Sequence, residues 1–187
     1  NAEMQPLIIR IAEIGEQGLK LDRTIDQGWL AEVLSDDLPS PFEPEAPAQL
    51  GGRIRRVGLD LVVEASLVLA LRSECASCLA PFSLSLPVGF QLTLRPAPGG
   101  RELPAEIELR AEDLDEAFYS GEELDLADLV REQILLALPM YPRCKPDCRG
   151  LCPGCGANLN TDACRCEEEA VDPRLAALKD IDIKAKP

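Results

Sequence analysis

Residues 67–94, LVLALRSECASCLAPFSLSLPVGFQLTL, contain two runs in which every second residue is apolar. In the first run, Leu67, Leu69 and Leu71 share one face. The second run is longer, and its apolar positions are Phe82, Leu84, Leu86, Val88, Phe90, Leu92 and Leu94. Because the side chains of a strand point alternately to its two faces, this period of two predicts two long antiparallel strands. The turn between these strands carries Cys75 and Cys78.

Weaker patterns before this hairpin predict a second hairpin, a helix and a linker. Residues 7–11 and 18–22 flank a turn-like segment at residues 13–16 and are typical of a short hairpin. A short helix is expected over residues 29–34. Residues 38–47 contain four prolines, which disfavour a helix and cannot donate hydrogen bonds in a sheet. We therefore expect this segment to be an extended linker.

The patterns after the long hairpin predict one more strand and two helices. Ala105, Ile107 and Leu109 alternate as in a strand, and most of the acidic stretch at residues 112–123 is expected to be a solvated face or a loop. Asp125 is placed to cap a helix that runs to Leu138.

A further short helix is expected to begin at Asp172-Pro173 and run to Leu178. The predicted fold class is α+β: an antiparallel sheet with a few packed helices in residues 1–143, followed in residues 144–187 by a Cys-rich module and the short C-terminal helix.

The composition favours a folded protein and narrows its possible functions. The 187 residues are 46% hydrophobic and 28% charged, as in globular chains that can bury a sizeable core. The net charge of −14 argues against bulk attraction to nucleic acid or anionic membranes. There is no histidine, which removes Ser-His-Asp and Cys-His catalysis. No apolar run of about 18 residues and no secretory signal pattern is present, so we expect a cytoplasmic protein without membrane contact.

The eight cysteines are the strongest chemical signal in the chain. They are Cys75 and Cys78 in the hairpin turn, then Cys144, Cys148, Cys152, Cys155, Cys164 and Cys166. Two cysteines separated by two residues can turn both sulfurs toward one ion, and two such pairs complete the tetrahedral site that zinc prefers. The glycines of Cys152-Pro-Gly-Cys155-Gly resemble those of a zinc-ribbon knuckle. The sequence therefore predicts two metal ions, with zinc as the metal.

The spacing favours one division of the cysteines and leaves another open. In the favoured division, the first site consists of Cys75, Cys78, Cys144 and Cys148, and the second of Cys152, Cys155, Cys164 and Cys166. The first site would then tie the helix that ends near Leu138 to the sheet. In the alternative, Cys144, Cys148, Cys152 and Cys155 close one local site and the remaining four cysteines form the other.

Four thiolates with no open position make a structural site rather than a catalytic one, so we expect no enzyme activity and no small-molecule substrate. Three other interpretations use the same residues. Iron or an iron-sulfur cluster takes the same thiolate ligands. Disulfides or buried thiols are disfavoured by the absence of an export signal and by the clustering. A thiol-redox enzyme could use Cys75-x-x-Cys78, although the pair lies in a strand turn and not at the start of a helix.

Taken in order, several motifs resemble those of the YceD family of large ribosomal RNA subunit accumulation proteins. They are Cys75-x-x-Cys78-Leu-x-Pro-Phe82, Leu124-Asp-Leu126 through Leu136-Ala-Leu-Pro139, Cys148-Arg-Gly-Leu-Cys152-Pro-x-Cys155-Gly156, Asn158-Leu-Asn160, Cys164-x-Cys166 and Asp172-Pro-Arg-Leu-Ala-Ala-Leu178. The similarity covers residues 67–178. It implies a non-catalytic role in accumulation of the 23S ribosomal RNA and in assembly of the large ribosomal subunit.

Local basic groups are the candidate RNA contacts of this acidic chain. They are Arg53, Arg55 and Arg56, and then Arg143, Lys145, Arg149 and Arg165 beside the cysteines. Arginine side chains on one face could bind a few phosphates through paired hydrogen bonds. These residues could equally be ordinary surface charges, because RNA-binding domains are usually basic. A basic ribosomal or assembly protein is the other partner that the acidic surface would suit.

Overall fold

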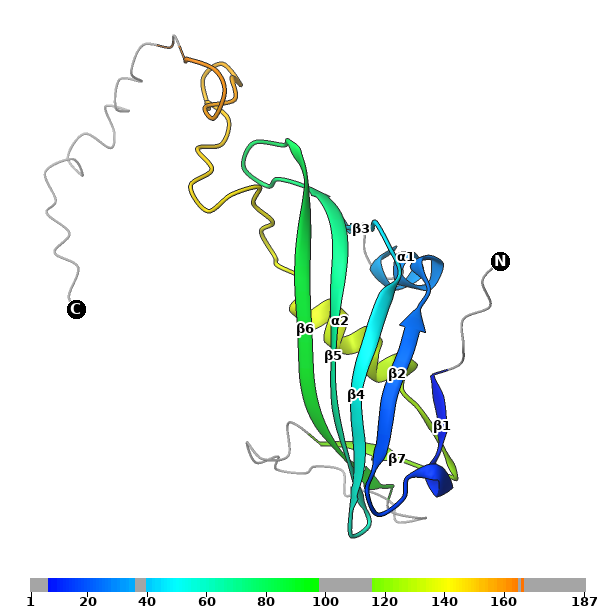
Figure 1. Ribbon diagram of the computed structural model, residues 1–187. Coiled ribbons are helices and arrows are strands. Elements are labelled where there is room, and N and C mark those ends of the chain that lie inside the picture. Colours follow the sequence, from blue (N-terminus) through cyan, green and yellow to red (C-terminus); the bar gives the residue numbers. More distant parts are fainter. Residues whose placement is uncertain (1–6, 36–39, 98–115, 165, 167–187) are drawn as a thin grey trace, which may run out of the picture. The chain divides into compact units, whose positions relative to one another are not determined.

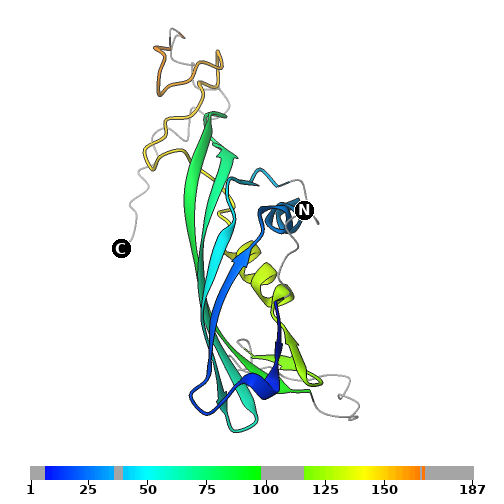
Figure 2. The same ribbon diagram turned by 45° about the vertical axis from the view of Figure 1, so that its right-hand side comes forward.

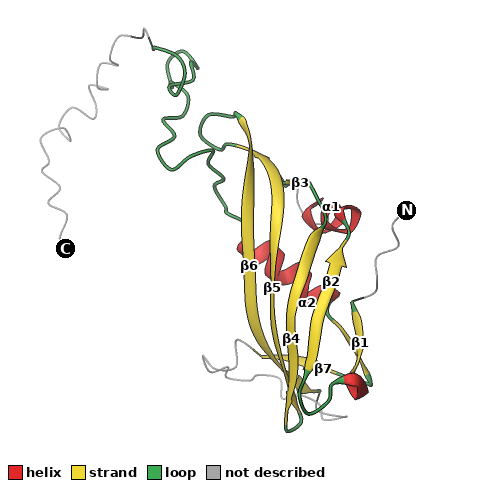
Figure 3. Ribbon diagram, in the orientation of Figure 1, coloured by secondary structure: helices red, strands yellow, loops and turns green. Residues whose placement is uncertain are grey.

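The computed structural model describes residues 7–35, 40–97, 116–164 and 166 (Figure 1). The chain divides into two compact units. The first unit consists of residues 1–76 and 80–144, and the second of residues 77–79 and 145–187. Among the described residues, every helix and strand belongs to the first unit, and the described part of the second unit is loop (green in Figure 3).

The first unit is built on a six-stranded sheet whose order is β2-β4-β5-β6-β7, with β3 paired to β5. Its strands are β2 (Leu19–Ile25), β3 (Glu43–Pro44), β4 (Ala48–Val57), β5 (Asp60–Glu74), β6 (Pro81–Pro96) and β7 (Glu116–Tyr119). All neighbouring strands in this sheet pair antiparallel, except β6 and β7, which are parallel. A second, two-stranded sheet pairs β1 (Ile8–Arg10) with β8 (Glu123–Asp125). The remaining elements are the 3-10 helix η1 (Ile11–Glu13) and the α-helices α1 (Gln27–Ser35) and α2 (Ala127–Ala137).

One face of the sheet forms the core, and both α-helices lie on that face (Figure 2). The alternation in β5 is nearly complete: Leu61, Val63, Leu67, Leu69 and Leu71 are all at most 3% exposed. The helices add their apolar stripes, which are Leu30, Val33 and Leu34 of α1 and Val130 and Ile134 of α2. Burial of such a side chain stabilises the fold by about 1.5–3 kcal/mol, which explains why period-two apolar patterning specifies this sheet.

Strand β6 lies at the edge of the described part of the sheet over most of its length, because β7 pairs only with Thr93–Pro96. Pro81 and Pro87 lie in this edge segment and have no amide hydrogen to offer another strand. Prolines on an edge strand limit pairing with other chains.

The predicted class, α+β with an antiparallel sheet, packed helices and a C-terminal cluster of cysteines, is confirmed. The long hairpin is β5 and β6. The helix expected at residues 29–34 lies inside α1. Helix α2 ends at Ala137, one residue before the predicted end, and the Asp125 Oδ1 atom accepts a hydrogen bond from the Ala127 amide at 2.8 Å.

One prediction about local structure was wrong, and two were incomplete. The N-terminal segments do not form a hairpin, because β1 pairs with β8 and β2 pairs with β4. The described part of the acidic stretch is half-buried or exposed, but it also contains β7 and the first residue of β8, which were not predicted. In the described part of the proline-rich segment, Glu43–Pro44 is extended but pairs with β5, so it is not only a linker. The strand expected at residues 105–109 and the helix expected at residues 172–178 lie outside the described residues.

Candidate metal centres

The first cysteine pair lies in the turn between β5 and β6, and the turn has a specific backbone geometry. The Cys75 amide donates to the Ala80 carbonyl at 3.0 Å. Leu79 has a φ of 57°, a left-handed conformation that is unusual for a residue other than glycine. Cys75 and Cys78 are 0% and 5% exposed. Reactive redox cysteines are normally accessible to their substrates, so this burial argues against the redox interpretation of the pair.

The second Cys-x-x-Cys pair, Cys152 and Cys155, adopts the same kind of turn. The Cys152 amide donates to the Ala157 carbonyl at 2.8 Å, and the Gly156 amide donates to the Cys152 carbonyl at 2.8 Å. Gly156 has a φ of 73° and occupies the position that Leu79 holds in the first turn. Both turns therefore place a left-handed residue directly after the second cysteine.

Backbone hydrogen bonds position the segments that carry the other cysteines. The Ala76 amide donates to the Pro142 carbonyl at 2.8 Å, and the Leu151 amide donates to the Ser77 carbonyl at 3.1 Å. Gly150 has a φ of 74°, and a Cβ atom there would lie 3.1 Å from the Ser77 carbonyl oxygen. Glycine suits this position because of its positive φ, and a larger residue would also crowd the Ser77 carbonyl oxygen.

The structure brings the cysteines together in two groups of four. One group is Cys75, Cys78, Cys144 and Cys148, and the other is Cys152, Cys155, Cys164 and Cys166; within each group all Sγ atoms lie within 4.8 Å of one another. Four thiolates at about 2.3 Å from a zinc ion would have their sulfurs about 3.8 Å apart. Each group can therefore hold one metal ion. The alternative division, with Cys144, Cys148, Cys152 and Cys155 in one site, is not the arrangement in the structure.

The second group is the more exposed of the two. Cys155, Cys164 and Cys166 are exposed, and only Cys152 is buried. The Cys152 sulfur lies 3.2 Å from that of Cys164 and 3.9 Å from that of Cys166, and the Cys155 and Cys164 sulfurs are 3.8 Å apart.

In the second group, the surroundings favour ionisation of one sulfur and oppose ionisation of another. The Cys155 amide, the Cys164 thiol and the Gly154 amide donate to the Cys152 sulfur and lower its pKa to about 6. Interactions with the sulfurs of Cys155, Cys164 and Cys152 raise the pKa of Cys166 to about 12. A divalent cation at the centre would reverse this opposition, because it stabilises all four thiolates at once. The charge pattern therefore fits a metal site.

Asn160 contacts a cysteine of the first group. The Asn160 Nδ2 atom donates to the Cys148 sulfur at 3.4 Å. The sequence showed the Asn158-Leu159-Asn160 motif, but it gave no indication of this contact, which joins residues on either side of the second knuckle.

The candidate RNA contacts fall in different places. Arg53 and Arg55 alternate along β4 on the face opposite the helices, where Arg55 forms an ion pair with Glu64. Arg56 lies on the other face, and its Nη2 atom donates to the Ile11 carbonyl at 3.0 Å. Arg143, Lys145 and Arg149 are exposed in the Cys-rich segment, whereas Arg165 lies outside the described residues.

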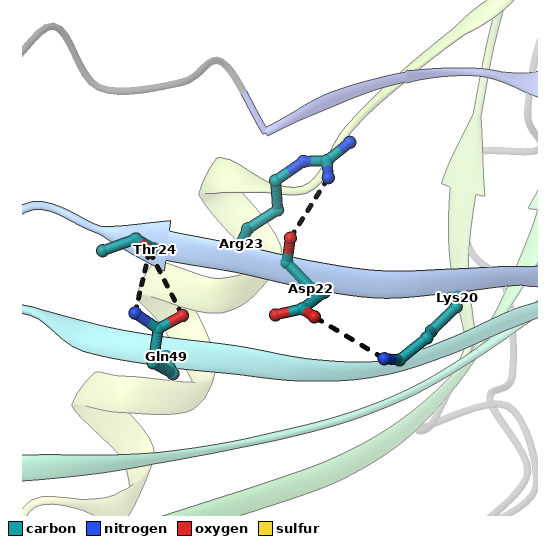
Figure 4. Close-up of polar contacts among 5 residues, drawn as sticks. All are labelled: Lys20, Asp22, Arg23, Thr24 and Gln49. Carbon is teal, nitrogen blue, oxygen red and sulfur yellow. Dashed lines mark hydrogen bonds and ion pairs between the residues drawn. The ribbon is translucent and has the colours of Figure 1, made fainter.

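The outer face of β2 and β4 carries charges of both signs (Figure 4). Lys20 lies opposite Arg53 in the sheet and pairs with Asp22 at 3.5 Å. Thr24 and Gln49 form a cross-strand hydrogen bond of 2.8 Å. This face is therefore mixed in charge and not a uniformly basic surface.

The sequence patterns did not predict a cavity of about 740 Å³ in the first unit. It is lined by Arg10, Ile11, Ala12, Arg56, Tyr119, Gly121, Glu122 and Glu123. Its residues come from distant parts of the chain, and its lining includes the Arg10–Glu123 ion pair at 3.8 Å. Among the described residues, no helix has both the length and the apolar character needed to span a membrane.

Comparison with known proteins gives matches over most of the chain. The family model described as large ribosomal RNA subunit accumulation protein YceD matches residues 63–182. An uncharacterized protein of Mycobacterium tuberculosis is 31% identical over 127 residues, covering 67% of this chain and 58% of the relative. The Zea mays protein named large ribosomal RNA subunit accumulation protein YCED homolog 1, chloroplastic, is 27% identical over 194 residues. These cover 92% of this chain and 60% of the relative. The chain thus spans less than two thirds of the length of these relatives. No solved structure shows significant similarity to it.

Proposed function

This chain belongs to the YceD family of large ribosomal RNA subunit accumulation proteins, and on that premise we propose that it is a non-catalytic, zinc-binding factor. It supports accumulation of the 23S ribosomal RNA and assembly of the large ribosomal subunit. It acts in the cytoplasm by binding, either to the RNA or to a ribosomal or assembly protein. The observation that carries the metal-binding part is the collection of all eight cysteines into two groups of four.

Zinc is the proposed metal because tetrahedral four-cysteine sites are its usual structural sites in proteins. Iron uses the same ligands and is the alternative that metal analysis distinguishes. When zinc is bound, it supplies positive charge and a fixed geometry. The chain's own residues supply the rest: the two knuckle turns orient the sulfurs, and the amides of Cys155 and Gly154 donate to Cys152.

Two sets of residues are the proposed binding contacts. The proposed RNA contacts are Arg53, Arg55, Arg56, Arg143, Lys145 and Arg149. The proposed protein contact is an exposed apolar group at the end of α2, in which Leu136, Met140 and Tyr141 are 72%, 88% and 77% exposed. Exposed apolar patches commonly mark protein interfaces, and the chain's acidity suits a basic ribosomal partner.

The test of this function is the ratio of 23S to 16S ribosomal RNA in the native host after depletion of the protein. We expect the ratio to fall, and to be restored by the wild-type chain. Cys75→Ser with Cys78→Ser should not restore it, whereas Ser85→Ala, an exposed change on the edge strand, should restore it fully. An unchanged ratio after depletion would contradict the proposed function.

Protein crosslinking in the same host separates the two binding modes. A contact through the apolar group predicts that Met140→Asp removes a crosslinked protein, whereas a direct RNA contact predicts that Arg53→Glu with Arg55→Glu removes crosslinked 23S RNA. The control for both crosslinking experiments is Arg23→Glu on β2, which also reverses a charge but lies outside the proposed contacts.

A further inference from the structure

Asn160 lies in the loop between two members of the second cysteine group but contacts a member of the first. Its Nδ2 atom donates to the Cys148 sulfur at 3.4 Å, and its Oδ1 atom accepts from the Arg149 amide at 3.0 Å. The loop that carries Asn160 runs from Cys155 to Cys164, which both belong to the second group. One side chain therefore connects the two groups.

Asn158 fixes the orientation of the Asn160 carboxamide. The Asn158 Oδ1 atom accepts from both the Asn160 amide at 3.0 Å and the Asn160 Nδ2 atom at 2.8 Å. An amide nitrogen is the only donor of that side chain, so the Asn160 Oδ1 atom must face Arg149 while its Nδ2 atom faces the sulfur. The Asn-x-Asn spacing thereby positions one N–H group on a cysteine.

The backbone holds the same two segments together. The Leu159 amide donates to the Gly150 carbonyl at 2.9 Å, and Leu151 and Asn158 form an isolated antiparallel bridge. The segment directly after Cys148 is thus hydrogen-bonded to the loop of the second group. A metal ion on Cys155 and Cys164 would fix both ends of this loop.

We propose that Asn160 is a positioning residue that couples the two metal groups, by donating a hydrogen bond to the Cys148 thiolate from a loop whose conformation the second metal fixes. A hydrogen bond donated to a metal-bound thiolate offsets its negative charge and orients it, and such outer partners commonly change metal affinity by about 10- to 100-fold. The coupling is reciprocal, so metal in either group raises the affinity of the other. This inference rests on the proposed metal binding.

The experiment uses the full chain loaded with cadmium, whose NMR spectrum gives a separate resonance for each cysteine group. Asn160→Asp keeps an oxygen that accepts from the Arg149 amide but removes the donor to Cys148. We expect cadmium in the first group to bind about 10- to 100-fold more weakly in a chelator competition, with its resonance shifted. The second resonance reports that the loop is still folded.

Asn158→Asp is the matched control, because it adds the same charge two residues away and keeps the oxygen that accepts from Asn160. The added negative charge by itself attracts a cation, so this variant should bind cadmium in the first group as tightly as the wild-type chain or more tightly. Equal weakening in both variants, or no weakening in Asn160→Asp, would overturn the role of the Asn160 donor.

A second variant tests the coupling without altering Asn160. Cys155→Ser with Cys164→Ser empties the second group, and we expect the first group to lose about tenfold in cadmium affinity. Adding Asn160→Asp to this variant should then have little further effect, because the two changes act through the same hydrogen bond. Fully additive losses would overturn the coupling. Absence of metal from the wild-type chain would instead overturn the proposed function.

Discussion

The two Cys-x-x-Cys knuckles share one backbone turn but are supported in different ways. In each, the amide of the first cysteine donates to a carbonyl five residues later, at 3.0 Å from Cys75 and 2.8 Å from Cys152. The first turn closes the longest hairpin of the sheet, and both of its cysteines are buried. The second lies in a segment in which, as far as residue 164, the one β-type pairing that the structure describes is the isolated bridge between Leu151 and Asn158. The same ligand geometry can therefore be imposed by a hairpin or by local turns alone.

This difference predicts where metal contributes most to folding. A segment of loops buries too little apolar surface to offset the conformational entropy that it loses on ordering. Metal binding supplies the missing free energy in small Cys-rich modules, with apparent values of about 10–16 kcal/mol in zinc fingers. The second knuckle should therefore depend on its metal for structure, whereas the hairpin of the first should persist without it.

The largest expected effect comes from Cys152→Ser. It removes the most buried sulfur of the second group, so the segment around residues 152–164 should lose its fold and its metal. Hydrogen exchange should show these amides exchanging at unprotected rates while those of β5 and β6 stay protected. Thr161→Ala, in the same loop, is the control and should change neither. Loss of protection throughout β5 as well would contradict the expected difference between the two knuckles.

A smaller effect is expected from Leu69→Ala in β5, where the side chain is 1% exposed. The cavity left in the core should lower the free energy of unfolding of the first unit by about 2–5 kcal/mol. The control is Val68→Ala on the outer face, which is 58% exposed and should cost well under half as much. Denaturant unfolding followed by tryptophan fluorescence measures both, because Trp29 packs against the core. Similar losses from the two variants would contradict the assignment of the core face.

The smallest effects are expected at the left-handed residue of each turn, and they have opposite signs. Leu79→Gly relieves a left-handed conformation that costs about 1–2 kcal/mol for a residue with a Cβ atom, so it should stabilise the metal-loaded protein by about 1 kcal/mol. Gly156→Ala introduces the same cost into the second turn. A Cβ atom at Gly156 meets nothing within 4 Å, so the backbone conformation alone causes the loss.

Chelator-induced metal release measures this pair of variants. Leu79→Gly should slow release from the first group, and Gly156→Ala should speed release from the second by about tenfold or less. A change of the same sign in both variants would show that the two turns are not equivalent.

Local patterns predicted the parts of the fold that are formed by neighbouring residues. The hairpin of β5 and β6 and the helices α1 and α2 follow from periodicity, caps and proline stops within a few turns. The pairing of β1 with β8 could not be predicted in this way, because three residues near the N-terminus pair with residues 123–125. So short a strand carries too little pattern to specify a distant partner.

The candidate sites show the same limit. Cysteine spacing indicated the Cys75–Cys78 and Cys152–Cys155 pairs, because knuckle turns are local, but it left open which other cysteines join each pair. The contact of Asn160 with Cys148 has no periodic signal and became visible only in the structure. Arg53, Arg55 and Arg56 were grouped as candidate RNA contacts because they are close in sequence. The period of a strand, however, already places Arg55 and Arg56 on opposite faces of β4.

The most direct test of metal binding is the metal content of the full chain, purified under reducing conditions and measured by elemental analysis. Thiol titration before and after a chelator then shows whether the metal protects the cysteines. We expect about two zinc ions per chain, with thiols that react only after chelation and with the exposed second group released first. Little metal, together with cysteines that react directly or are already oxidised, would contradict it.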